Sequence, residues 1–232
     1  MSYLEVNLDP FVSLKEMVNS PLTNPLNLLS YIESVGVGGI SFTYRYDIDY
    51  INDLSDLRAM TGSRINIRIP ADMNEIQRIL PLKPDVITLV DLSTQDSTVQ
   101  VPSQELKEIS ETLSENEDFA LSLRIKPDLK QLKAAYQYGV DIVEIATNDL
   151  VIQDTHKGFL NILELIVHIA RTAEKHGLRV AAAGQLNRRI VLALNEVCNV
   201  EFISIGRAIL SQSLIIGFEA GLREIMDIVD NR

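Results

Sequence analysis

The chain has 232 residues, a hydrophobic content of 46% and a formal net charge of −11 at pH 7. The acidic balance argues against binding to nucleic acid or to an anionic membrane. The single cysteine, Cys198, excludes an intramolecular disulfide, and no apolar run is long enough to cross a bilayer. The N-terminus has no signal-peptide pattern, so we expect a cytoplasmic protein.

Short apolar strands alternate with helical stretches along the chain, which is typical of a parallel α/β fold. The eight expected strands cover residues 4–8, 39–44, 64–69, 85–90, 119–125, 142–146, 179–183 and 201–205. Eight evenly spread strands in a chain of this length favour a closed (β/α)8 barrel, the TIM barrel, over an open sheet. No linker or low-complexity tract interrupts the pattern, so residues 1–232 are expected to form one domain.

Helix signals lie between these strands. Asn24 followed by Pro25 predicts a capped helix start. Apolar residues at helical spacing predict a helix that begins near Leu160 and is stopped by Gly177. The same spacing predicts one last helix over residues 209–225. The polar stretches without a period, where we expect mobile loops, are residues 93–103 and 148–158.

Three expected strands end in an arginine on the polar parity: Arg45, Arg68 and Arg124. The polar residue two positions earlier is Thr43, Asn66 or Ser122, respectively. Because outer helices cover one parity of each strand, the polar parity is expected to face the barrel interior. An acidic protein that directs cationic groups into one interior cavity is expected to bind an anion there.

In barrels of this class the working face lies at the C-terminal ends of the strands. The candidate ligand-binding residues at those ends are Asn7, Asp9, Thr43, Arg45, Arg68, Arg124, Thr147, Gly184, Gln185, Gly206 and Arg207. Glycines after strands seven and eight allow backbone N–H groups to approach a phosphate, and the helix after Gly206 adds its positive end. Arg207 is expected to add a forked contact to the same group.

Two alternatives remain open for these residues. The inward arginines could pair only with Asp9 and Glu144, as an internal network that fixes the barrel. Four arginines exceed these two carboxylates, and the surplus favours an anionic ligand. Gly184 and Gly206 could also be turn glycines alone, although their position on adjacent strand ends favours a phosphate site.

Other chemistry finds little support in the sequence. No cluster has metal-ligand spacing and no nucleotide or nucleophile motif is present, so neither a metal nor a cofactor is expected. None of the three histidines (His156 in a loop, His168 and His176 on a helix) ends a strand, so solvated or packing roles are expected for them. Cys198 follows a helix, where a nucleophile role is not expected.

Four stretches carry a family resemblance: VNLD at residues 6–9, GISFTYR at 39–45, KPDVITLV at 83–90 and SIGRAI at 204–209. In their order and spacing the chain resembles the pyridoxine 5′-phosphate synthase family over nearly its whole length. The resemblance implies a barrel that condenses 3-amino-2-oxopropyl phosphate with 1-deoxyxylulose 5-phosphate by serial proton transfer. It also implies homo-oligomers built from dimers.

The chain departs from the family pattern at the proton-transfer positions. The family's histidine, glutamate and histidine are here Thr43, Arg68 and Gly184, and none of these can act as an acid or base near pH 7. The family's histidine after the first-strand aspartate is Pro10, and its last glycine-histidine pair is 206–207, Gly-Arg. The threonine- and glycine-rich loop after the fourth strand is shortened.

Other family positions match, and they carry implied roles. Asn7 and Asp9 match ligand positions of the first strand, and Arg45 matches an arginine that holds a substrate. Glu144 matches a carboxylate credited with stabilising the reaction, and Gly206 matches the phosphate loop. The sequence therefore keeps parts of a binding site and has replaced the proton-transfer set.

Three hypotheses follow. The first is a relative without the synthase chemistry that binds a phosphorylated small molecule. The second is an enzyme, either the same synthase with a rearranged site or a new activity on a phosphorylated substrate, in which Glu144, Asp9 and His156 move protons. The third is a structural partner whose arginines are locked in internal ion pairs, acting in a mixed oligomer with an active homologue.

Overall fold

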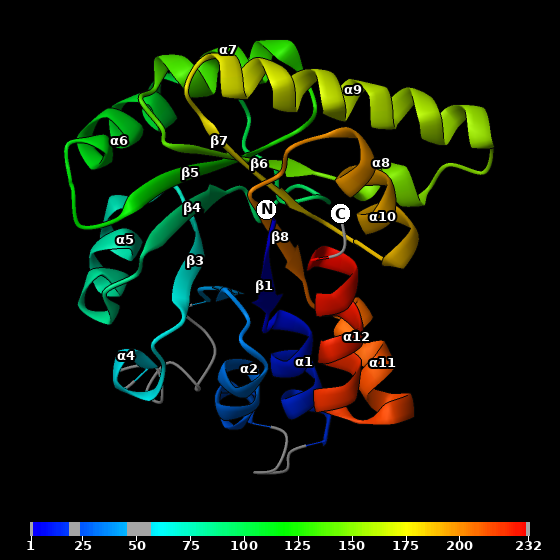
Figure 1. Ribbon diagram of the computed structural model, residues 1–232. Helices are drawn as coiled ribbons and strands as arrows, with labels where there is room; N and C mark the ends of the chain where they lie inside the picture. The colour runs from blue at the N-terminus through cyan, green and yellow to red at the C-terminus, as the bar shows by residue number, and fades with distance from the viewer. Residues whose placement is uncertain (1, 19–23, 46–56, 231–232) are drawn as a thin grey trace.

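Eight parallel strands pair in chain order and close into a barrel, β1-β2-β3-β4-β5-β6-β7-β8 (Figure 1). The computed structural model describes residues 2–18, 24–45 and 57–230. The strands are β1 (Tyr3–Asn7), β2 (Gly39–Thr43), β3 (Arg64–Pro70), β4 (Val86–Val90), β5 (Ala120–Ile125), β6 (Ile142–Ala146), β7 (Arg179–Ala183) and β8 (Phe202–Ile205). The predicted (β/α)8 barrel is confirmed, and each predicted strand agrees within one residue. The remaining positions of the predicted 1–232 domain lie outside the described residues.

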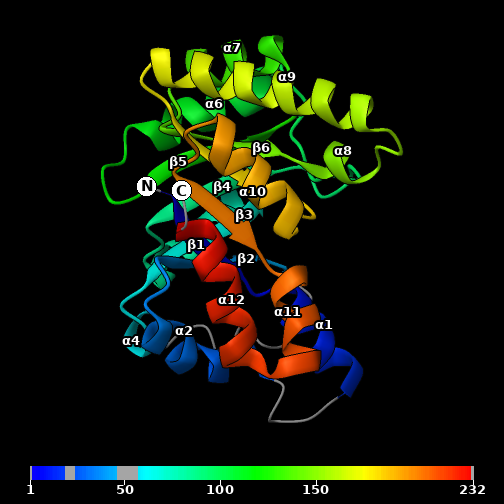
Figure 2. The ribbon, with the colours of Figure 1, turned by 45° about the vertical axis from the view of Figure 1, so that its right-hand side comes forward.

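Helices cover the outside of the barrel in the described part of the chain (Figures 1 and 2). The α-helices are α1 (Asp9–Val18), α2 (Leu29–Val35), α4 (Leu57–Met60), α5 (Met73–Ile79), α6 (Gln104–Ser114), α7 (Leu129–Gln137), α8 (Asn148–Val151), α9 (His156–Lys175), α10 (Arg188–Val197), α11 (Arg207–Ile216) and α12 (Phe218–Asp230). Two 3₁₀ turns are η2 (Pro25–Leu28) and η3 (Leu80–Leu82). None of the helices in the described ranges combines the length and apolarity that a membrane span requires.

Three local expectations need correction. The expected loop at residues 148–158 contains α8 and the first three residues of α9, with only 152–155 outside a helix, and the Thr155 hydroxyl caps α9 by accepting from the Gly158 N–H at 3.0 Å. The predicted last helix is two helices, α11 and α12, separated by Gly217 at φ +86°. Asn24 does cap the next turn, but that turn is 3₁₀ before α2 begins.

Strand alternation divides the molecule into two apolar regions around a polar interior. On β3, Ile65, Ile67 and Ile69 are fully buried in the main core, which packs the strands against the helices. Inside the barrel a small separate cluster, which we call the apolar plug, consists of Val86, Ile142, Ala181 and Phe202. The inward polar side chains Ser41, Thr88, Ser122, Glu144 and Ser204 follow the plug positions towards the C-terminal ends of the strands.

The packing of α9 gives a stability prediction with a control on the same helix. Ile166 is fully buried, whereas its neighbour Leu165 is 38% exposed. We expect Ile166→Ala to lower the free energy of unfolding by about 2–5 kcal/mol, because it leaves a cavity in the main core. Leu165→Ala should cost less than about 1 kcal/mol. Urea denaturation measures both, and equal losses would contradict the assigned helix face.

Candidate functional site at the barrel mouth

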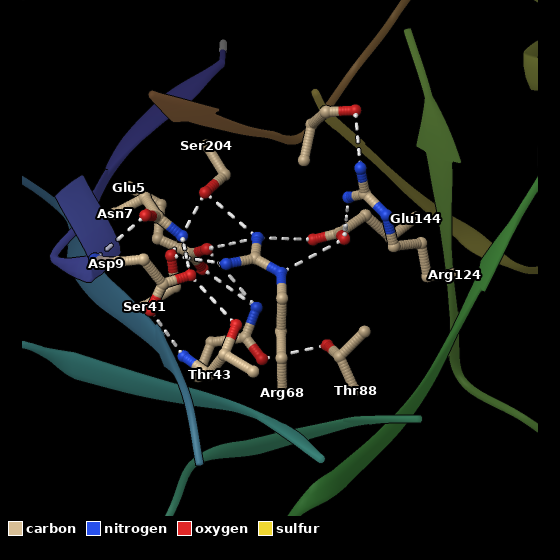
Figure 3. Close-up of polar contacts among 12 residues, drawn as sticks. Glu5, Asn7, Asp9, Ser41, Thr43, Arg68, Thr88, Arg124, Glu144 and Ser204 are labelled. Atoms are coloured by element: carbon tan, nitrogen blue, oxygen red, sulfur yellow. Dashed lines mark hydrogen bonds and ion pairs between the residues drawn. The ribbon is translucent and has the colours of Figure 1, made fainter. Parts of the chain in front are cut away.

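Arg68 at the end of β3 crosses the barrel interior to Glu144 on β6 (Figure 3). Its Nε and Nη2 donate to the two carboxylate oxygens of Glu144 at 3.2 and 2.7 Å. The same guanidinium donates to the hydroxyls of Ser41 and Ser204, each at 2.9 Å. The forked geometry of the pair is the strongest form of arginine–carboxylate contact.

Arg124 at the end of β5 is the second partner of Glu144. Its Nη1 donates to Glu144 Oε1 at 2.5 Å, and its Nε donates to the carbonyl of Asp96 at 2.7 Å. Its Nη2 reaches the carbonyl of Ala183 at 3.4 Å and Asn148 Oδ1 at 3.5 Å. Arg124 thus joins β5, β6, the end of β7 and the loop after β4.

Burial and pairing act in opposite directions on these groups. Burial by itself raises the pKa of Glu144, but Arg68 and Arg124 outweigh it and lower this pKa from its usual 4.5 to about 2. Burial lowers the pKa of Arg68, but the charge and hydrogen bonds of Glu144, with the charge of Glu5, raise it overall. Glu144 therefore stays ionised at neutral pH and cannot serve there as a proton donor.

Glu5 is an interior carboxylate that the sequence analysis missed. It is 2% exposed on β1 and accepts from Asn66 Nδ2 at 3.2 Å and from Arg64 Nη1 at 3.1 Å, with Arg68 Nη2 at 3.5 Å. The sequence could have predicted that Glu5 faces the barrel interior, because it stands two positions before Asn7 on the same strand. The expected surplus of interior arginines over carboxylates is therefore wrong: Glu5 was not counted, and Arg45 is exposed.

Asp9 joins the ends of β1 and β2. Its Oδ1 accepts from the backbone N–H of Thr43 at 2.7 Å, and its Oδ2 accepts from the Thr43 hydroxyl at 2.8 Å. Asn7 Nδ2 donates to the same Oδ2 at 3.2 Å, and Asn7 Oδ1 accepts from the Asp9 N–H at 3.0 Å. This local arrangement explains why Asn, Asp and Thr stand at these three positions.

A cavity of about 180 Å³, which we call the mouth cavity, opens at the C-terminal ends of the strands. It brings together nine of the expected site residues: Asn7, Asp9, Thr43, Arg68, Arg124, Gly184, Gln185, Gly206 and Arg207. Arg45 lies in a neighbouring pocket that shares Asp9, Thr43 and Leu92 with the mouth cavity. Glu144 and Thr147 are buried beside the cavity and do not line it.

The two glycines of the site are required by close packing. Gly184 has φ +116°, and a Cβ there would collide with Asn148 Oδ1. A Cβ on Gly206 would lie 2.7 Å from the Asn7 carbonyl oxygen. The Thr147 hydroxyl also donates to the Gly184 carbonyl at 2.6 Å. Close packing therefore accounts for both glycines, and only Gly184 has the positive φ of a turn glycine.

Arg207 differs from the interior arginines. It is exposed at the first position of α11 and lines the mouth cavity. Its guanidinium makes no ion pair or hydrogen bond with any residue in the described ranges. Among the cations that line the mouth cavity, it is the one whose donors are not already taken up by described protein groups.

The loop after β4 supplies lining residues that the sequence analysis did not identify, Leu92 and Ser97. The backbone N–H of Val99 donates to the Arg124 carbonyl at 2.9 Å, which complements the Arg124 bond to the Asp96 carbonyl. As predicted, residues 93–103 contain neither helix nor strand. No sequence pattern predicted that Arg124 would fix residues 93–103 to the barrel by hydrogen bonds.

The histidines and the cysteine lie away from the mouth cavity. His156 is the first residue of α9 instead of a loop residue, and it is exposed, as are His168 and His176. Cys198 is buried at the end of α10. Within the ranges that the structure describes, no three His, Cys, Asp or Glu side chains are grouped to hold a metal ion.

Comparison with known proteins matches a family model over nearly the whole chain. The family model described as "Pyridoxal phosphate biosynthesis protein PdxJ" matches residues 4–231. A pyridoxine 5′-phosphate synthase from Syntrophobacter fumaroxidans is 29% identical, covering 99% of this chain and 100% of the relative. The synthase from Geobacter metallireducens is 27% identical, covering 99% of both chains.

Solved structures show the same fold at low identity. N-(5′-phosphoribosyl)anthranilate isomerase from Pyrococcus furiosus aligns with a TM-score of 0.65 at 12% identity, over 100% of both chains. Thiamine phosphate pyrophosphorylase from the same organism aligns with a TM-score of 0.66 at 12% identity, over 98% of this chain and 95% of that one. At this identity the likeness establishes the barrel alone.

The pairing of Glu144 predicts an acid-dependent stability. Because its folded pKa lies below its unfolded value, the pair stabilises the fold fully above pH 4.5, and this contribution is lost as the pH falls towards 2. We expect Glu144→Gln to lower the free energy of unfolding at pH 7 by about 3–5 kcal/mol, since it leaves two arginines unpaired. The difference from wild type should shrink below pH 4.5.

Urea unfolding at pH 7, 4 and 3 measures this. The control is Glu164→Gln on the exposed face of α9, which should change the free energy of unfolding by less than about 0.5 kcal/mol. A Glu144→Gln effect that stays constant from pH 7 to pH 3 would disprove the low pKa.

Proposed function

The chain belongs to the family of pyridoxal phosphate biosynthesis protein PdxJ, and on this basis we propose that it binds a phosphorylated small molecule in the mouth cavity without the family's synthase chemistry. The observation that carries the proposal is the pairing of Arg68 with Glu144. Arg68, a cation at the position where the family pattern has a glutamate, keeps the Glu144 carboxylate ionised at neutral pH.

The ionisable groups of the mouth cavity support the loss of proton transfer. They are Asp9, Arg68, Arg124 and Arg207. Three of these four groups are arginines, which are not deprotonated in proteins and so cannot exchange protons with a substrate. Serial acid–base chemistry needs groups that exchange protons near the working pH. The histidines that could do so in the described ranges do not line the cavity.

Anion binding is supported by Arg207 together with the start of α11. This ten-residue helix begins at the cavity, and the positive end of its dipole favours an anion. The volume of about 180 Å³ is below the range of about 300–1,000 Å³ typical of drug-sized ligands. A phosphate with a short carbon chain is therefore the preferred occupant, with the pocket around Arg45 available for a longer one.

A second candidate function is that of a structural partner, as a homo-oligomer or in a mixed oligomer with an active homologue. The internal ion pairs of Arg68 and Arg124 favour it. So do exposed apolar side chains on the packed helices α1 and α11, where Met17 is 84% exposed, Leu214 74% and Ile215 78%. Such a concentration is unusual on a monomer surface. We also propose a cytoplasmic location, because the single cysteine, Cys198, is free and a reducing compartment keeps thiols in that state.

Removing Arg207 should abolish most anion binding. We expect Arg207→Ala to weaken binding of inorganic phosphate and of pyridoxine 5′-phosphate at least tenfold, since about 1.5–3 kcal/mol is ordinary for a hydrogen bond to a charged group. Isothermal titration calorimetry measures the affinities. The matched control is Arg78→Ala on α5, an exposed arginine paired with Glu75 far along the chain from the site. Equal affinities of Arg207→Ala and wild type would remove Arg207 from the site.

The absence of synthase chemistry is tested with the purified protein. Supplied with 3-amino-2-oxopropyl phosphate and 1-deoxyxylulose 5-phosphate, it should form no pyridoxine 5′-phosphate above a no-protein control, followed by mass spectrometry. Product formation would overturn the proposal in favour of an enzyme with a rearranged site. In that case Asp9→Asn and Glu144→Gln would be the first variants to assay.

A further inference from the structure

Resting on the proposed function, we infer that the mouth cavity selects phosphate esters that carry a hydroxyl or carbonyl next to the phosphate, and rejects those that carry an ammonium group there. Arg68 is the specificity-determining residue. The negative charges of the site are directed at protein groups that already neutralise them.

Burial and two arginine partners close Glu144 off from a cationic ligand. Its Oε1 accepts from Arg68 Nε and Arg124 Nη1, and its Oε2 accepts from Arg68 Nη2. Its side chain is 1% exposed. The Arg68 guanidinium therefore occupies the position in which a ligand ammonium would otherwise meet this carboxylate (Figure 3).

The other two interior carboxylates are also engaged. Glu5 is 2% exposed and already contacts Arg64, Arg68 and Asn66. The Asp9 carboxylate lines the cavity but accepts three hydrogen bonds, two from Thr43 and one from Asn7, out of about four that a carboxylate can accept. Glu16 lines the neighbouring pocket with Arg45, not the mouth cavity.

The charged groups that line the mouth cavity are three arginines and one carboxylate, that of Asp9, so positive charge predominates there. Arg68, Arg124 and Arg207 all line the mouth cavity, and Arg207 lacks a protein partner in the described ranges. A ligand ammonium would give up its hydration beside like charges, and both effects disfavour it. A hydroxyl or carbonyl oxygen brings no such charge, and the neutral side chains of Gln185 and Ser97 line the same cavity.

A matched pair of short esters tests this in the wild-type protein. The probes are 2-hydroxyethyl phosphate and 2-aminoethyl phosphate, which differ by one group and are short enough to keep that group near the phosphate. At pH 7.5 the amine is charged. We expect the hydroxyl ester to bind at least tenfold more tightly by isothermal titration calorimetry. Equal binding, or tighter binding of the amine, would overturn the inference.

Variants at Arg68 assign the preference to this residue. Arg68→Met removes one positive charge from the cavity and leaves Glu144 with Arg124 and Glu5 with Arg64 as their remaining cationic partners, so the preference should fall at least fivefold or reverse. Arg68→Lys keeps the charge and should keep the preference. The control Arg78→Met should behave as wild type. If Arg68→Met does not fold, as judged by circular dichroism, a Lys variant that has lost the preference would still contradict the role of the charge.

Inorganic phosphate separates the two proposals. If neither phosphate nor either ester binds, the proposed function itself fails. If phosphate binds and the two esters bind equally, the phosphate site stands and the selection against ammonium groups is wrong.

Discussion

The mouth of this barrel depends on one buried carboxylate held between two arginines. An ionised glutamate that is almost fully removed from water is tolerated only when opposite charges and hydrogen bonds compensate for its lost hydration. Arg68 and Arg124 supply both to Glu144. The remaining donors of Arg68 reach the hydroxyls of Ser41 and Ser204. Strands that are not neighbours in the sheet are thereby fixed relative to one another by polar contacts.

The same pairing determines what chemistry the site can support. A carboxylate with a pKa of about 2 is a good counter-ion and a poor acid or base at neutral pH. The chain belongs to the PdxJ family and has its charged interior side chains directed at one another. The charged side chains of the interior are three arginines and three carboxylates: Arg64, Arg68, Arg124, Glu5, Asp9 and Glu144. Their charges nearly cancel, and Arg207 at the rim supplies the excess positive charge.

The sequence was sufficient for the barrel and for most of the cavity lining, because strand parity and the strand ends are local properties. It was insufficient for interactions across the barrel. Glu5 was missed although it faces the same side of β1 as Asn7. A single glutamate in a strand does not show which side chains lie across the barrel from it. Arg45 shares the parity of Arg68, yet it follows the last residue of β2 and turns to a neighbouring pocket. Residues 148–158 read as a loop because capping residues are also turn residues.

The apolar plug formed by Val86, Ile142, Ala181 and Phe202 makes the barrel a cup with a single opening. The guanidinium of Arg64 lies 3.6 Å from the centre of the Phe202 ring and reinforces that base. A ligand must enter and leave by the same end, so arrival and departure share one path. A molecule bound at the rim would therefore lie on the path by which any second molecule could reach the charged layer beneath it.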